Sequence, residues 1–86
     1  MQDDESEFEV SPFSGPIRHD GVELRLKIYR FASPEEPWEL EVTAPNGSTT
    51  TWEELFERDE DALEAFRAAL REEGIALFLD PAATRH

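Results

Sequence analysis

Two histidines and a dense run of carboxylates are the side chains of this sequence that could carry chemistry. His19 lies beside Asp20, and a histidine paired with a carboxylate is the arrangement that activates a nucleophile in catalytic triads. Gly21 follows directly, and His-Asp-Gly is typical of a tight turn. The other histidine, His86, is the last residue of the sequence. We therefore interpret His19 as a solvated turn residue and predict no catalytic residue.

The carboxylates between residues 53 and 61 have a structural explanation. General acid–base catalysis needs a carboxylate whose pKa is raised in an apolar pocket, and a continuous polar run does not indicate one. Asp59-Glu60-Asp61 lacks the glycine and the distal glutamate of a calcium-binding loop. Acidic residues are, however, favoured in the first turn of a helix. We predict a helix N-terminus here, and neither a metal site nor a cofactor.

The elements that position these residues begin with two alternating segments. Residues 22–30 alternate strictly between apolar and polar side chains, which is the pattern of a strand with one buried face. Residues 38–43 show the same period. If the two strands pair antiparallel, Lys27 lies opposite Glu41 and Tyr29 lies opposite Glu39. Opposite charges such as those of Lys27 and Glu41 stabilise a sheet when they face each other across two strands.

Residues 44–48 predict a hairpin turn, and its length decides which side of the sheet Trp52 occupies. Asn46-Gly47 alone favours a two-residue turn, whereas Pro45 favours a three-residue turn with Gly47 at positive φ. The longer turn places Val42 opposite Thr50 and buries Trp52, because a slip of one residue reverses every side chain. Burying a tryptophan is worth more than burying a threonine, so we expect the longer turn.

One amphipathic helix follows, and we expect it to begin near Asp59 and to end at Gly74. Its apolar positions recur with helical spacing and form a single stripe, and glycine commonly ends a helix. After the helix, Ile75–Leu79 is wholly apolar. It is either a short fourth strand or a covered coil.

These elements predict an α+β fold, in which a three-stranded antiparallel meander packs on one C-terminal helix. Residues 8–80 form one domain between an acidic disordered tail (1–7) and a frayed C-terminal tail (81–86). Residues 8–16 are predicted to be irregular, and because Pro12 and Pro16 remove backbone donors, any strand there is short or at an edge of the sheet. We expect the apolar side chains of that part of the chain to lie over the core: Phe8, Val10, Phe13 and Ile17.

The composition restricts the partners of this protein. Twenty-one acidic residues against eight basic ones give a net charge of −13, and nucleic-acid binding requires Lys and Arg to neutralise phosphates. We therefore expect no binding to nucleic acid or to an anionic membrane. The start of the sequence is unlike a signal peptide, which leads us to expect a cytoplasmic location. The acidity serves either solubility, which we favour, or recognition of a basic partner.

Exposed aromatic and apolar residues are the remaining candidates for a functional site. Tyr29 is the one aromatic side chain on the outward face of the clearest strand, and Phe31 begins the loop that follows it. For Tyr29 the alternative, which we slightly favour, is a cross-strand pair with Glu39. Ile75–Leu79 would expose Leu77 and Phe78 if it were an edge strand, although closing the core is the alternative that we favour. We predict a non-enzymatic protein-interaction or regulatory module, monomeric or weakly dimeric, with Tyr29, Phe31, Leu77 and Phe78 as candidate partner-binding residues. The alternative is an inhibitor or antitoxin-like protein that mimics nucleic acid and binds a basic partner.

Overall fold

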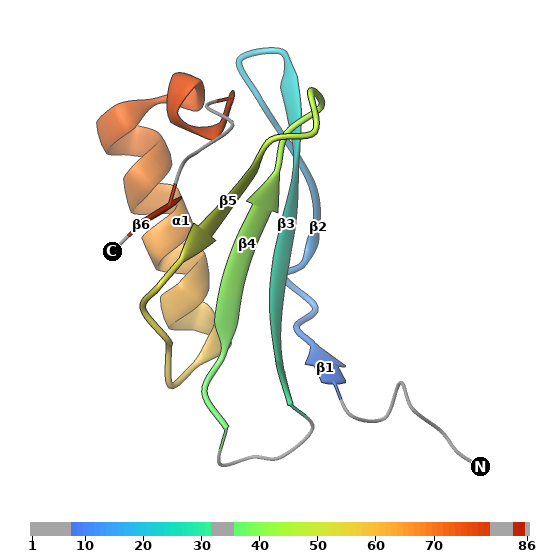
Figure 1. The fold of residues 1–86 in the computed structure, drawn as a ribbon, viewed down its shortest axis with the longest axis vertical. Helices are drawn as coiled ribbons and strands as arrows, with labels where there is room; N and C mark the ends of the chain where they lie inside the picture. Colours follow the sequence, from blue (N-terminus) through green and yellow to red (C-terminus); the bar gives the residue numbers. More distant parts are fainter. Residues whose placement is uncertain (1–7, 32–35, 80–83, 86) are drawn as a thin grey trace, which may run out of the picture.

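A computed structural model describes residues 8–31, 36–79 and 84–85. It shows a small single domain in which one helix packs on one face of a sheet (Figure 1), so the predicted α+β class is confirmed. The predicted tail 1–7 lies outside the described residues. No helix within the described ranges is long and apolar enough to cross a membrane. The elements are, in chain order, β1 (Phe8–Val10), β2 (Gly15–His19), β3 (Val22–Phe31), β4 (Glu39–Thr43), β5 (Thr49–Trp52), α1 (Asp59–Glu73), the 3-10 helix η2 (Ile75–Leu79) and β6 (Thr84–Arg85).

Strand β3 is the centre of the sheet, and β3, β4 and β5 form the predicted antiparallel meander. Leu24, Leu26 and Ile28 of β3 are buried, as the alternating pattern predicts. Across the strand pair, Lys27 lies opposite Glu41 and Tyr29 opposite Glu39. The register predicted from charge pairing is therefore confirmed.

The turn between β4 and β5 is the longer of the two alternatives. Gly47 has a φ of 89°, its N–H donates to Ala44 O at 2.9 Å, and Ala44 N–H donates to Ser48 O at 2.8 Å. Val42 consequently pairs with Thr50, and Trp52 is buried. Asn46 fits this turn because its Oδ1 accepts a hydrogen bond from Ser48 N–H at 3.0 Å. The prediction drawn from Pro45 and from the burial of Trp52 is confirmed.

The prediction of three strands is wrong, because β1 and β2 both pair antiparallel with β3 along the edge opposite β4. A turn at residues 11–14 separates them. There, Ser14 Oγ accepts a hydrogen bond from Ile28 N–H at 2.9 Å and donates to Ile28 O at 3.2 Å. One serine side chain thus replaces the backbone partner that β3 loses at the turn. For this reason the prolines interrupt the edge strand without ending its pairing.

Helix α1 has the predicted bounds. Asp59, Glu60 and Asp61 occupy its first turn, where carboxylates stabilise the helix dipole. Gly74 ends it with a φ of 79°, and its N–H donates to Leu70 O at 3.0 Å. The face toward the sheet is buried through Ala62, Phe66 and Ala69.

The segment after α1 is not a strand. Ile75–Leu79 forms the 3-10 helix η2 and turns Phe78 into the core. The carbonyl of Leu79 accepts hydrogen bonds from Asn46 Nδ2 at 3.2 Å and from Ser48 Oγ at 3.4 Å, so side chains rather than a neighbouring strand fix this segment. Of the two alternatives for this segment, the fourth strand is therefore wrong. Thr84–Arg85, predicted within the frayed tail, instead forms β6, which pairs parallel with β5.

The core fills the space between α1 and the sheet, and β1 lies outside it. Phe8, Val10 and Phe13 are 47%, 55% and 40% exposed, so the expectation that they cover the core is wrong; of that group, Ile17 does pack against it. The pairing with β3 explains the exposure, because Phe8 and Val10 lie opposite Phe31 and Tyr29. Directly opposite residues share a face of the sheet, and this face is the one that α1 leaves open (Figure 1).

Candidate interaction surface

The four predicted partner-binding residues lie in two separate places. Tyr29 and Phe31 are on the open face of β3, and Phe31 is 49% exposed. Phe78 is fully buried, with its ring centroid 5.6 Å from that of Phe66 and 6.2 Å from that of Trp52. Leu77 is half-buried and packs against the same core. Because Phe78 has no exposed surface, it serves the core, and we remove it from the candidate site.

Phe8 and Val10, which we expected to lie over the core, complete the site. The ring of Phe8 stacks on that of Phe31 at a centroid distance of 5.0 Å and meets the ring of Tyr29 edge-on at 6.1 Å. Val10 lies opposite Tyr29. We call Phe8, Val10, Tyr29 and Phe31 the aromatic patch. The Phe-x-Val spacing of β1 was the available signal, since residues two apart on a strand share one face.

Tyr29 is the polar member of the aromatic patch. Its hydroxyl donates a hydrogen bond to Glu39 Oε1 at 3.4 Å, across the pair of strands. Burial raises the pKa of the Tyr29 hydroxyl, and the negative charges of Glu39 and Glu41 raise it further. The Nζ atom of Lys27 lies 4.8 Å from the centroid of the Tyr29 ring, within reach of a cation–π contact. Tyr29 therefore stays protonated at neutral pH and presents an apolar ring with one anchored donor.

A depression adjoins three of the four residues of the patch. It has a volume of about 330 Å³ and is lined by Phe8, Val10, Lys27 and Tyr29. Its lining combines apolar side chains with one cation and one hydroxyl, and pockets that bind ligands have such a mainly apolar lining with a few polar groups. Exposed aromatic residues are also enriched among those that dominate binding energy at interfaces.

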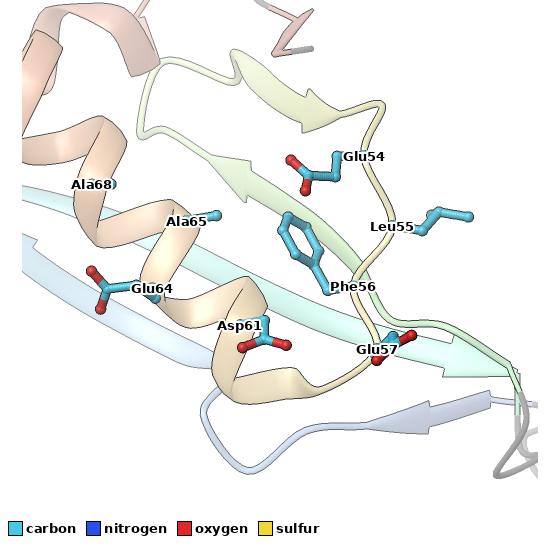
Figure 2. A pocket seen from close by; sticks show the side chains of 8 residues that line it. All are labelled: Glu54, Leu55, Phe56, Glu57, Asp61, Glu64, Ala65 and Ala68. Carbon is cyan, nitrogen blue, oxygen red and sulfur yellow. The ribbon is translucent and has the colours of Figure 1, made fainter.

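A second depression lies on the other side of the molecule, between α1 and the segment that follows β5 (Figure 2). Its apolar lining includes Leu55, Phe56 and Ala65, and Figure 2 shows the Phe56 ring between the segment after β5 and α1. It has a volume of about 510 Å³. Four carboxylates line it, and we call it the acidic groove: Glu54, Glu57, Asp61 and Glu64.

The histidine and carboxylates that we considered for catalysis lie in a turn and at the start of a helix. His19 and Asp20 lie at the β2–β3 turn, with His19 Nε2 3.5 Å from Asp20 Oδ2. Asp59 accepts a hydrogen bond from Ser11 and begins α1. Within residues 8–31, 36–79 and 84–85, no group of three or more His, Cys, Asp or Glu side chains is arranged to hold a metal ion.

Comparison of the chain with protein-family models, with curated proteins and with solved structures gave no match.

Proposed function

We propose that this protein is a small, non-enzymatic protein-interaction module, and that it binds its partner through the aromatic patch. The observation that carries the proposal is the Phe8–Phe31 stack, because two phenylalanine rings lie 5.0 Å apart and about half exposed on the face that α1 leaves open. Exposed apolar side chains that gather in one place mark interaction sites more often than single exposed ones do.

Apolar burial at the patch supplies part of the binding energy. Covering the exposed halves of Phe8, Val10 and Phe31 contributes about 1 kcal/mol for each side chain. The patch is partly organised before binding, since the Phe8 and Phe31 rings stack and the Tyr29 hydroxyl donates to Glu39. Preorganised surfaces bind more tightly because less side-chain order is lost on binding.

Affinity capture from a native lysate tests this proposal with a matched pair of variants. Phe31→Ser removes half of the stack, while Leu55→Ser removes a similarly exposed apolar side chain at the acidic groove. We expect the partner to be retained by Leu55→Ser, to be lost from Phe31→Ser, and to survive high salt, because an apolar interface is weakly screened. A partner that is held equally by both variants would contradict the proposal.

A second candidate function is recognition of a basic, nucleic-acid-binding protein by mimicry of phosphate. The acidic groove favours it, because four carboxylates line one depression of a protein whose net charge is −13. Closely spaced carboxylates attract Lys and Arg as phosphates do, and such attraction falls with salt. Under this function the pair Asp61→Asn and Glu64→Gln loses the partner, Phe31→Ser keeps it, and high salt releases it.

A further inference from the structure

We propose that the partner binds as an added β-strand on the outer edge of β1, and that it is an extended, basic segment with alternating apolar side chains. This inference rests on the proposed function and specifies its partner class. Strand addition joins backbone hydrogen bonds, which supply affinity, to side-chain contacts on one face, which supply specificity.

The hydrogen-bond pattern of β1 leaves its outer edge able to pair. Ser11 N–H donates to Ile28 O at 2.8 Å, so these residues occupy a hydrogen-bonded position of the ladder. Such positions alternate in an antiparallel pair, and the next one is Glu9 with Arg30. The backbone N–H and C=O groups of Phe8 and Val10 consequently point away from β3. Among the residues that the structure describes, no strand pairs with that edge.

The adjacent strand β2 shows the opposite arrangement. Pro16 lies opposite Arg25, between the positions at which Gly15 and Ile17 pair with β3. Its backbone therefore faces outward, where a proline removes the donor that an added strand would need. A charged residue, Arg18, occupies the other outward position. Prolines and charges are the features that prevent edge pairing in natural sheets. Strand β2 carries both at its outward positions, whereas β1 carries Phe8 and Val10 there.

The aromatic patch gives the added strand a surface for its side chains. Alternate residues of a strand next to β1 would lie on the open face beside Phe8 and Val10, since the side chains of neighbouring strands share their faces. The depression of about 330 Å³ that these two residues form with Lys27 and Tyr29 fits one such apolar side chain. Phe8 and Val10 would therefore supply both the backbone hydrogen bonds and the apolar contacts to the added strand.

Charge decides between a second copy of this chain and a different partner. Each copy has a net charge of −13, so self-association at this edge is opposed by repulsion. Four of the seven residues that precede Phe8 in the sequence are acidic: Asp3, Asp4, Glu5 and Glu7. A segment that pairs with β1 and carries Lys or Arg complements this charge; high salt weakens this attraction but not the backbone pairing and apolar contacts that hold the partner.

Selection from a library of random eight-residue peptides, displayed at physiological salt, tests the inference. Wild-type protein should enrich peptides in which apolar residues alternate and Lys and Arg exceed Asp and Glu. Val10→Pro keeps an apolar side chain and removes one outward N–H, and it should weaken binding of the selected peptides at least ten-fold. Its matched control is Arg18→Ala on β2, which should bind as wild type. Circular dichroism checks that Val10→Pro is folded.

Amide hydrogen exchange gives a readout that does not depend on a variant. Bound peptide should slow exchange at Phe8 and Val10 and leave Arg18 unchanged. The inference is overturned if no peptide is enriched, if the enriched peptides are acidic, if Val10→Pro binds them equally, or if the wild type dimerises through this edge. Some peptides could lose binding to Phe31→Ser and yet leave amide hydrogen exchange at Phe8 and Val10 unaltered. That result would overturn strand addition while supporting the proposed function. If the selected peptides bound Phe31→Ser as tightly as the wild type, the proposed function itself would be overturned.

Discussion

The hydroxyl of Ser11 donates a hydrogen bond to Asp59 Oδ2 at 2.8 Å, and this contact joins the β1–β2 turn to the first residue of α1. The two residues are 48 positions apart in the sequence. Ser11 Oγ also accepts a hydrogen bond from Phe13 N–H at 3.1 Å, so one buried hydroxyl fixes the turn and attaches it to the helix. The placement of β1, and with it the aromatic patch, depends on this serine.

Ser11→Ala should lower the free energy of unfolding by about 1–2 kcal/mol, because it removes a hydrogen bond to a carboxylate and leaves Phe13 N–H without its acceptor. Urea denaturation of Ser11→Ala, Asp59→Ala and the double variant measures the coupling between the two residues. We expect a coupling of about 1 kcal/mol. Strict additivity of the two single variants would show that the contact contributes nothing.

Thr50→Val should stabilise the protein. Thr50 is fully buried on β5, and its Oγ1 has no hydrogen-bond partner among the described residues. Valine has nearly the same shape without the buried hydroxyl, so we expect a gain of about 1 kcal/mol in the free energy of unfolding. Thr51→Val on the exposed face is the control and should change little. A destabilised Thr50→Val would indicate that the hydroxyl is satisfied in solution.

The titration of Tyr29 should be shifted upward. Burial and then the charges of Glu39 and Glu41 raise its pKa in the folded state, above an ordinary value near 10. A raised pKa favours the protonated, folded form, so this contribution to stability is complete below about pH 10 and is lost as the pH rises through the folded-state pKa. Tyr29 is the single tyrosine of the sequence, so phenolate absorbance reports it alone. Glu39→Gln should lower the midpoint, and an unshifted wild-type midpoint would refute the stated environment.

Substitution by aspartate should strongly destabilise the protein at Phe78 but not at Phe31. Phe78→Asp places an unpaired charge in the core and should cost more than about 4 kcal/mol, which is most of the stability of a small domain. Phe31→Asp introduces the charge on an exposed position and should leave the protein folded. Thermal unfolding followed by circular dichroism compares them. A stably folded Phe78→Asp would argue that η2 is not part of the core.

The centre of the fold could be predicted from the sequence because local patterns specify it. Alternation defines β3 and β4, Pro45 with Asn46-Gly47 sets the turn and its register, and acidic residues with Gly74 delimit α1. In each case the residues that decide the structure are neighbours in the chain. Tyr29 was found in the same way, from an outward position of one strand, whereas Phe31 was predicted to begin a loop and instead ends β3.

The edge of the sheet could not be predicted, because distant residues decide it. Strand β1 depends on Ser11 contacting Asp59 and on Ser14 contacting Ile28, and neither pairing leaves a local signal. The run around Phe78 has no polar residue to indicate a period, so tertiary contacts with Trp52 and Phe66 select the 3-10 helix. Half of the aromatic patch was missed for this reason, since Phe8 and Val10 belong to that edge.

The affinity of the captured partner for a variant of the patch tests the central claim most directly. Isothermal titration calorimetry compares the wild type with the double variant Phe8→Ser and Phe31→Ser, after circular dichroism has shown that both are folded. Loss of two half-exposed rings at about 1 kcal/mol each predicts binding that is weaker by roughly thirty-fold. Equal affinity of the wild type and the double variant would contradict the claim that the aromatic patch is the binding surface.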